Sequence, residues 1–416
     1  MNRPELLCPA SSLEVLKVAV RYGADAVYIG GEAYSLRAKA KNFSMEEMAA
    51  GIAFAHAHGV RVYVTANILA HNADLDGIRA YFGELRPLHP DALIISDPGV
   101  FLLARETCPE IPVHVSTQAN NVNVGTFRFW RDLGAARVVT GRELSLNEIR
   151  DIHAALGDTI EIETFIHGAM CISYSGRCLL SAYLTDRSAN SGACTHPCRW
   201  SYVLEEEKRP GQYFPVEETE RGTFIFNSRD LCMIDHIPEL MESGISSFKI
   251  EGRMKTALYV ATVARTYRRA IDDYAVSPAR YQQNLPWYRE QIRACTLRPF
   301  TTGFFFGRPS DEAQCYDNCT YESAYTYLGL VEAVDAQGLH LKQRNKFSLG
   351  EQLEVMKPDG RNLAATVLTI AGPDGPMESA PHPLQPLTVT LSGGEAEPGD
   401  ILRRREAAAL PADATL

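Results

Sequence analysis

The first 250 residues alternate between short apolar runs, rich in valine and isoleucine, and longer amphipathic stretches. Each short run has the length and composition of a strand in a parallel sheet that is covered on both faces. Strands are expected over 5–10, 26–31, 61–68, 92–97, 113–118, 137–141, 160–166 and 247–252. Eight strands with helices between them make a closed (β/α)8 barrel, which is the predicted fold of this part of the chain.

Serine residues mark several of the expected helix starts. Ser11, Ser44 and Ser145 stand at N-cap positions, and Ser11 and Ser44 each have a glutamate three residues later, the spacing of a capping box. An open doubly wound sheet is the alternative arrangement. It is disfavoured because no G-x-G-x-x-G motif follows the first predicted strand.

Two further regions depart from the barrel pattern. The connection over 168–246, between the seventh and eighth strands, is far longer than a crossover requires, and such connections are commonly functional. From 324 onward short strands alternate with turn signals, which predicts a small all-β domain, a barrel of its own. The predicted parts are a barrel (1–276) that includes the insertion 168–246, a helical or irregular connector (277–323), the β domain (324–406) and a tail (407–416).

Charge and hydropathy exclude several classes of protein. The chain has 41 Lys and Arg against 51 Asp and Glu, a net charge of −10, so nucleic-acid binding would need a local basic patch. No apolar run approaches the ~20 residues of a membrane span, and the start lacks the pattern of a secretory signal. We therefore expect a soluble cytoplasmic protein with no membrane partner; the sequence does not indicate whether it has a protein partner.

Four of the ten cysteines lie within 28 residues, at Cys171, Cys178, Cys194 and Cys198. Four thiolates suit either tetrahedral zinc or an iron–sulfur cluster. Structural zinc sites favour two close pairs, and only Cys194 and Cys198 form one, whereas the six-residue first gap fits a cluster better. The alternative is a set of small buried thiols, and the polar residues around these four count against it.

The residues around this cluster carry a family resemblance. The segments 163–171 (ETFIHGAMC) and 175–181 (SGRCLLS) resemble the signature of the collagenase-like peptidase U32 family. Further agreement lies in 6–10, 23–28, 115–120 and 249–253. Within the family the chain is most similar to the branch of prephenate-dependent tRNA uridine hydroxylation proteins, through 34–37, 194–200, 227–231 and 346–350. Cys8 and a shorter segment around 205–222 depart from the family pattern.

The resemblance implies a [4Fe–4S] cluster on Cys171, Cys178, Cys194 and Cys198. It also implies C5-hydroxylation of the wobble uridine (U34) of the tRNA anticodon to 5-hydroxyuridine, with prephenate as co-substrate in place of molecular oxygen. Two alternatives stay open: a metal-dependent peptidase, and a non-catalytic RNA-binding or accessory protein with a structural metal such as zinc. The peptidase is disfavoured because no nucleophile with a recognisable base and no H-E-x-x-H motif is present.

Polar residues gather where the predicted strands end, which in a barrel is the catalytic rim. The catalytic candidates are Glu163, His167 and Glu251, for proton transfer or substrate orientation. Glu163 and His167 share one face of their strand, so both are expected to point into the barrel mouth. For Glu163 and His167 the alternative is a buried pair that fixes the cysteine loop by hydrogen bonds.

Cations and amides near the same rim are candidates for binding the substrate. Prephenate carries two carboxylates, which arginine binds in a bidentate manner. The substrate-binding candidates are Arg37, Asn67, Gln118, Arg142, Arg177, Lys249 and Arg253. Buried Lys249 and Arg253 favour an anionic ligand, unless an acidic side chain of the rim pairs with them.

Two basic groups are candidates for contacting the tRNA backbone. They are Arg265, Arg268 and Arg269 on a predicted helix over 255–274, and Lys342, Arg344 and Lys346 in the β domain. A charge run on a helix is otherwise a solvated face.

Overall fold

The structure is a computed structural model. It describes residues 3–35, 42–170, 229–295, 299–307 and 324–406, and between 178 and 223 only 178, 180–185, 187, 189, 194–195, 197, 204–205, 213–214, 218–219 and 222–223.

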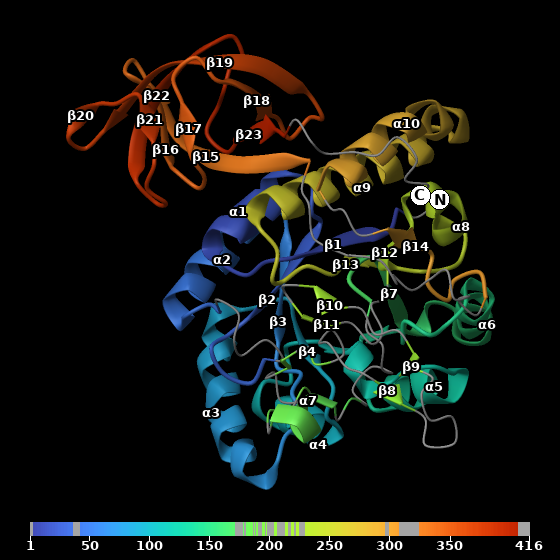
Figure 1. Cartoon of the computed structure of the whole chain (residues 1–416). Coiled ribbons are helices and arrows are strands. Elements are labelled where there is room, and N and C mark those ends of the chain that lie inside the picture. The colour runs from blue at the N-terminus through green and yellow to red at the C-terminus, as the bar shows by residue number, and fades with distance from the viewer. Residues whose placement is uncertain are drawn as a thin grey trace.

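The first part of the chain forms a closed barrel of parallel strands (Figure 1). The barrel strands are β1 (Glu5–Pro9), β2 (Ala26–Gly30), β3 (Arg61–Thr65), β4 (Ala92–Ile95), β5 (Val113–Val115), β6 (Arg137–Val139), β7 (Glu161–Gly168) and β13 (Ser247–Ile250). Each pairs with the next, and β13 pairs with both β7 and β1, which closes the barrel. The predicted (β/α)8 fold is confirmed. At the rim, the short strand β12 (Asp230–Cys232) pairs antiparallel with β7, and β14 (Phe300–Thr301) pairs with β12.

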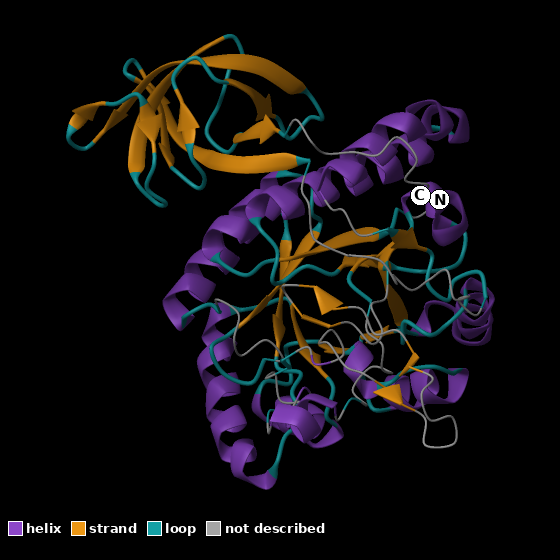
Figure 2. Ribbon diagram, viewed as in Figure 1, coloured by secondary structure: helices purple, strands orange, loops and turns teal. Residues whose placement is uncertain are grey.

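Helices surround this barrel (Figure 2). They are α1 (Leu13–Arg21), α2 (Met45–Ala57), α3 (Leu75–Leu85), α4 (Pro98–Thr107), α5 (Val124–Asp132), α6 (Leu146–Leu156), α8 (Ile237–Met241) and α9 (Ala257–Val276). Ser44 and Ser145 form the capping boxes of α2 and α6. The expected cap at Ser11 is wrong by one residue, because Ser12 has the extended backbone and accepts the N–H of Val15.

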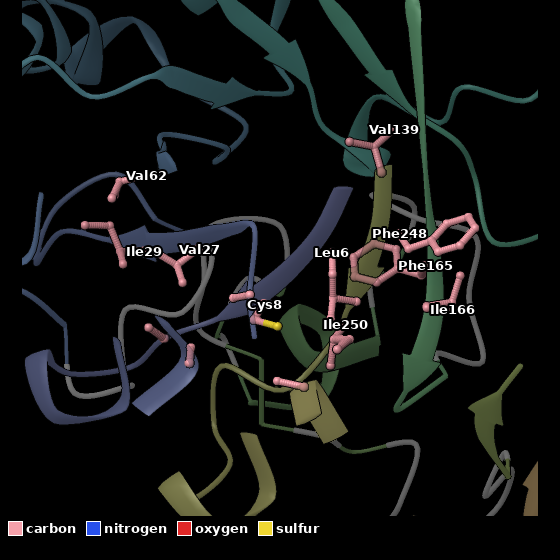
Figure 3. Packing of buried hydrophobic residues seen from close by; sticks show 14 of the residues in the cluster. Leu6, Cys8, Val27, Ile29, Val62, Val139, Phe165, Ile166, Phe248 and Ile250 are labelled. Atoms are coloured by element: carbon pink, nitrogen blue, oxygen red, sulfur yellow. The ribbon is translucent and has the colours of Figure 1, made fainter. Parts of the chain in front are cut away.

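Side chains alternate between the two faces of the barrel strands. Leu6 and Cys8 of β1 and Val27 and Ile29 of β2 point outward to the helices, in the core that Figure 3 shows. Leu7, Ala26 and Tyr28 belong to a separate cluster inside the barrel. The small Ala26 and its counterpart Ala92 in β4 leave room inside the barrel for long side chains from the other strands.

A long helix, α10 (Pro278–Cys295), occupies the first part of the connector and packs on α9. We expected a helical or irregular segment there. The signal for a helix is the spacing of Tyr281, Tyr288 and Ile292, all fully buried, with Leu285 partly buried between them.

The C-terminal part is an all-β domain, as predicted. Its main strands are β15 (Tyr325–Asp335), β16 (Gly338–Lys342), β18 (Gln352–Met356), β19 (Asn362–Gly372), β22 (Pro386–Ser392) and β23 (Ile401–Arg405), with short strands β17 (Phe347–Ser348), β20 (Gly375–Pro376) and β21 (Ser379–Ala380). The order β18-β23-β15-β16-β22-β19 is closed by pairing of β18 with β19, so this domain is a second barrel. It has its own apolar core, which includes Leu328, Val355 and Leu402.

The β domain rests on α1 and α9 (Figure 1). The Tyr22 hydroxyl at the end of α1 donates to the carbonyl of Met356 at 2.8 Å. Arg265 of α9 donates to the carbonyl of Lys357 (2.8 Å), to Gln291 Oε1 (2.7 Å) and to Asn362 Oδ1 (3.1 Å). Only 2% of Arg265 is exposed, so the expectation that it contacts tRNA phosphate is wrong: this side chain joins the two domains.

Replacing Arg265 with alanine is expected to lower the free energy of unfolding by about 3 kcal/mol, because several buried polar groups lose a charged partner together. Urea unfolding measures this loss. The control is Arg269→Ala, four residues further along the same helix, where the side chain is 38% exposed and is expected to contribute about 1 kcal/mol or less. Equal losses in the two variants would contradict the interdomain role.

Candidate functional site

A polar cavity opens at the carboxyl ends of the barrel strands, the face on which β/α-barrel active sites lie. Its volume is about 640 Å³, including the part open to solvent. The described residues that line it are Tyr28, Thr65, Asn67, Ile94, Ser116, Thr117, Gln118, Arg142, Phe165, Ala189, Lys249, Glu251 and Arg253. The structure therefore brings Asn67, Gln118, Arg142, Lys249, Glu251 and Arg253 together, all of them predicted at this rim.

Lys249 of β13 lies at the floor of the cavity with an acidic partner. Its Nζ is 2.7 Å from Glu163 Oε1 and 4.6 Å from the centroid of the Tyr28 ring. We expected Lys249 to bind either an anionic ligand or an acidic side chain of the protein, and the structure shows the ion pair with an acidic side chain. Glu163 itself is fully buried and does not line the cavity, because it lies two residues before Phe165 on β7. The expectation that Glu163 faces the barrel mouth is therefore corrected.

Arg253 follows β13 and is held by neutral groups. Its Nη1 donates to Ser35 Oγ at 2.6 Å and to Thr65 Oγ1 at 3.2 Å, and its Nη2 donates to Asn42 Oδ1 at 2.9 Å. Gly30, at the end of β2, leaves the space for this guanidinium, since a Cβ there would lie 2.2 Å from Nη2. Arg253 is thus fixed in one position at the side of the cavity.

Arg142 follows β6 and is half-buried. Its guanidinium lies over the Phe165 ring, 4.0 Å from the centroid, and its Nη1 donates to the carbonyl of Ala169 at 2.5 Å. Its Nε is buried and has no hydrogen-bond partner among the described residues. A buried N–H without an acceptor is costly, and the oxygen of a carboxylate or phosphate bound in the cavity would satisfy it.

Glu251 is the one carboxylate among the described residues that line the cavity. The Tyr28 hydroxyl donates to the carbonyl of Ile250 at 2.9 Å and lies 3.3 Å from Glu251 Oε2. Asn67 Nδ2 donates to Ser116 Oγ at 3.4 Å. The cavity thus offers one acidic group, three cations and several neutral donors and acceptors.

His167 lies away from this cavity, which corrects the expectation that it points into the barrel mouth. Its ring contacts Tyr267 and Tyr259 of α9 and Phe300 of β14, and its Nδ1 is 3.3 Å from the Tyr267 hydroxyl. The pairing of β7 with β13 shifts by one residue between Lys249 and Ile250. Such a bulge breaks the alternation of side chains along a strand and re-aims the residues beyond it.

Burial, with a smaller contribution from the charge of Lys255, lowers the pKa of His167 from 6.5 to about 3. Between these values the unfolded chain binds a proton that the folded chain does not, so this histidine destabilises the fold as the pH falls. On lowering the pH from 7 to 5, the wild type is expected to lose about 2 kcal/mol more stability than His167→Gln. Denaturant unfolding at both pH values measures the difference. A His382→Gln control at an exposed site should keep the wild-type loss, and an equal loss in His167→Gln would contradict this account.

Of the four cysteines predicted to hold a metal centre, Cys178 and Cys194 are described and are partly buried. Cys171 and Cys198, together with the substrate-binding candidates Arg37 and Arg177, lie outside the described residues. Among the described residues, which include only two of these four cysteines, no group of three or more potential metal ligands lies together.

The neighbours of Cys178 and Cys194 bring these two cysteine segments together. Ser181, at the start of α7 (Leu180–Thr185), accepts the backbone N–H of Thr195 at 3.1 Å, and its Oγ is 3.0 Å from Thr195 Oγ1. Ala189, which lies between the two cysteines in the sequence, lines the cavity. The donor set and this arrangement fit a thiolate-bound centre beside the barrel mouth.

The remaining cations predicted to contact tRNA mostly have acidic neighbours. Arg268 pairs with Asp25 (2.6 Å) and Asp272 (2.8 Å), and Arg269 is 3.7 Å from Asp273. In the β domain, Lys342 is 3.3 Å from Glu332, Arg344 pairs with Glu14, and Lys346 is exposed. The described parts of the chain thus give little support to a basic patch at these positions, and phosphate contacts from them stay a prediction.

Sequence reasoning missed several residues of the site. Thr65, Ser116 and Thr117 line the cavity at strand ends, so the signal that found Gln118 could have found them as well. Ser35 and Asn42, which hold Arg253, follow β2 in the sequence. Ser35 lies in the segment 34–37 that carries part of the family resemblance but was not named as a site residue, and Asn42 gave no signal.

Comparison with known proteins agrees with this architecture. The family model described as peptidase family U32 matches residues 11–315, and that of the peptidase family U32 C-terminal domain matches 323–403. The chain is 41% identical to tRNA hydroxylation protein P1 of Bacillus subtilis (97% of this chain, 95% of that protein) and 39% identical to tRNA hydroxylation protein P of Escherichia coli (86% and 87%). It is 37% identical to the 23S rRNA 5-hydroxycytidine C2501 synthase of Escherichia coli over 65% of this chain and 40% of that protein. No helix among the described residues is long and apolar enough to cross a membrane.

Proposed function

Because the chain belongs to peptidase family U32, whose two models match residues 11–315 and 323–403, we propose that it is an RNA-modifying enzyme that hydroxylates C5 of the wobble uridine (U34) in tRNA. The observation that carries this proposal is 41% identity to a tRNA hydroxylation protein over 97% of the chain. A more distant relative is named as an rRNA 5-hydroxycytidine synthase, which supports hydroxylation of a pyrimidine base in RNA as the shared chemistry.

The cavity suits a small anionic co-substrate. Arg142, Lys249 and Arg253 line it together, and the buried Nε of Arg142 has no hydrogen-bond acceptor among the residues that the structure describes. A dicarboxylate would supply such an acceptor, and arginine binds carboxylates with two parallel hydrogen bonds. We therefore assign prephenate to this cavity as the co-substrate that replaces molecular oxygen.

The pyrimidine would enter the same cavity from a single-stranded anticodon loop, where a base can leave its stack. Asn67 and Gln118 offer amide groups to the edge of the ring. Hydroxylation exchanges the hydrogen at C5 for a hydroxyl group. In this proposal Glu251 accepts the proton that leaves C5, and the co-substrate gives up the oxygen as a hydroxyl and retains the electron pair of the bond that breaks.

Cys171, Cys178, Cys194 and Cys198 would hold a [4Fe–4S] cluster, with zinc as the alternative metal. Four protein thiolates occupy every iron, so the chemistry that such a centre supplies is electron transfer or structural support of the loop. The hydrogen bonds between Ser181 and Thr195, which join the segments of Cys178 and Cys194, support this proposal, as does Ala189, which lies between these two cysteines in the sequence and lines the cavity.

A peptidase is the second candidate, because of the family name alone. The described residues that line the cavity include Ser116 and Thr117 but no histidine that could activate them. The cavity therefore supports hydroxylation better than nucleophilic peptide cleavage.

The proposed function is tested by mass spectrometry of nucleosides from a strain that lacks the gene. We expect 5-hydroxyuridine and nucleosides derived from it to disappear from tRNA, with 5-hydroxycytidine in 23S rRNA unchanged, and the plasmid-borne gene to restore them. Loss of 5-hydroxycytidine from 23S rRNA instead would show that the substrate is rRNA. Unchanged nucleosides in both RNAs would contradict the proposed function.

A further inference from the structure

A chain of alternating charges runs from the cavity through the inside of the barrel. Lys249 Nζ is 2.7 Å from Glu163 Oε1, and Glu163 Oε2 accepts Nη1 of Arg137 at 3.0 Å. The same Nη1 is 2.6 Å from Glu5 Oε1. These four side chains, which we call the barrel relay, are each 5% exposed or less and come from β13, β7, β6 and β1.

The relay ends at the opposite face of the barrel. Glu161, 49% exposed, pairs with Arg137 at 2.6 Å, and Arg61, 50% exposed, pairs with Glu5. Tyr63 and Ser247 add hydrogen bonds to Glu5 at 2.6 and 2.9 Å. Within the relay two cations and two anions alternate, so its buried charges balance.

The relay shifts the pKa values of Glu5 and Arg137. Burial raises the pKa of Glu5, but the charge and hydrogen bond of Arg137, together with the charge of Arg61 and the hydrogen bond of Tyr63, outweigh burial and hold that pKa below its usual value. Burial lowers the pKa of Arg137, and the charges of Glu5 and Glu163 outweigh it and raise that pKa. A buried ion pair is a poor source of stability compared with apolar packing. We therefore look for a role of the relay other than stabilising the fold.

We propose that Glu163, held in place by Arg137 and Glu5, is a positioning residue that keeps Lys249 a protonated ammonium at one fixed point of the cavity floor. Glu163 takes one of the three N–H donors of that ammonium, and the Tyr28 and Phe165 rings flank it at 4.6 and 5.5 Å. No second acceptor contacts this Nζ in the part of the chain that the structure describes, which leaves its other donors for an anionic ligand. This inference rests on the proposed function only in taking the cavity to be the reaction site.

The other titratable and charged groups around Lys249 come from the elements packed against it. Arg142, Glu251, Arg253 and Tyr28 line the same cavity. Burial, followed by the charges of Arg137 and Lys249, holds the pKa of His114 on β5 well below its usual value, so this residue stays neutral at physiological pH. Glu163 is the acid in direct contact with the ammonium.

The test measures the charge of Lys249 without RNA, prephenate or turnover. Cyanate carbamylates a neutral amine and not an ammonium, and peptide mass spectrometry gives the rate at each lysine between pH 7 and 9. In Glu163→Gln, which keeps the shape and removes the charge, we expect carbamylation of Lys249 to be about tenfold faster or more at pH 8 than in the wild type.

Two controls distinguish loss of the relay from loss of the fold. Glu161→Gln makes the same chemical change at the exposed end of the relay and should leave the rate at Lys249 within about twofold of wild type. Lys357 in the β domain is 4% exposed and paired with Asp400 at 2.8 Å, so its rate should stay low in every variant.

An unchanged rate at Lys249 in Glu163→Gln would overturn the inference. Should Glu163→Gln also expose Lys357, Glu163→Asp decides, because it retains the charge on a shorter side chain and should restore protection of Lys249. If Lys249 reacts rapidly in Glu163→Asp while Lys357 stays protected, the inference is also overturned. Since no step requires RNA, failure of the proposed function would leave these results standing.

Discussion

Replacing Cys178 with alanine is expected to remove the brown colour of the anaerobically purified protein and to abolish its hydroxylation of uridine. A [4Fe–4S] cluster needs all four thiolates, and loss of one exposes an iron to solvent and oxidation. Cys178 and Cys194 lie in segments that the structure joins through Ser181 and Thr195, which supports a shared centre. Iron and sulfide analysis with visible spectroscopy measures the cofactor, and nucleoside mass spectrometry measures the activity.

Cys108→Ala is the matched control, because this thiol is buried just after α4 and donates to the carbonyl of Ala104 at 3.4 Å. We expect it to retain iron, sulfide and activity. Stoichiometric zinc without sulfide in the wild type would contradict the cluster, and a Cys178→Ala protein that retains full iron and sulfide would exclude this residue as a ligand.

Replacing Arg142 with glutamine is expected to lower kcat/KM for the anionic co-substrate by about 100-fold or more, because a charged bidentate contact is lost in a partly buried site. Its guanidinium is already oriented by Phe165 and by the carbonyl of Ala169, so little ordering is needed when the ligand binds. The measurement is the rate of uridine hydroxylation against prephenate concentration.

Arg142→Lys separates charge from geometry, since lysine keeps the charge and loses the planar fork. We expect it to recover only a small part of the activity. Arg79→Gln on α3, where the side chain is 53% exposed and pairs with Glu106, should behave as wild type. Unchanged kinetics in Arg142→Gln would show that the co-substrate binds elsewhere.

The barrel and the position of its mouth could be predicted because both follow from local patterns. Strands buried on both faces read as short Val- and Ile-rich runs, and the residues just after them, such as Asn67 and Gln118, meet at one face whatever their partners. The order of the strands and helices along the chain was therefore enough to predict several of the residues that line the cavity.

The roles of individual charged residues could not be predicted because they depend on neighbours distant in sequence. Glu163 lies below the cavity because Arg137 and Lys249 reach it inside the barrel. His167 is turned away by a shift in register that no residue pattern marks. Arg265 has the periodicity of an exposed helix face, and only docking of the β domain buries it.

The most direct test of the central claim uses wild-type protein purified without oxygen and loaded with iron and sulfide, an unmodified tRNA and prephenate under argon. Mass spectrometry of anticodon fragments then follows the mass of the nucleotide at position 34. We predict that this uridine gains one oxygen atom, that the gain requires prephenate, and that the Arg142→Gln protein fails to produce it. No gain of oxygen at position 34 with the fully loaded wild-type protein would contradict the assignment of this chain as a tRNA uridine hydroxylase.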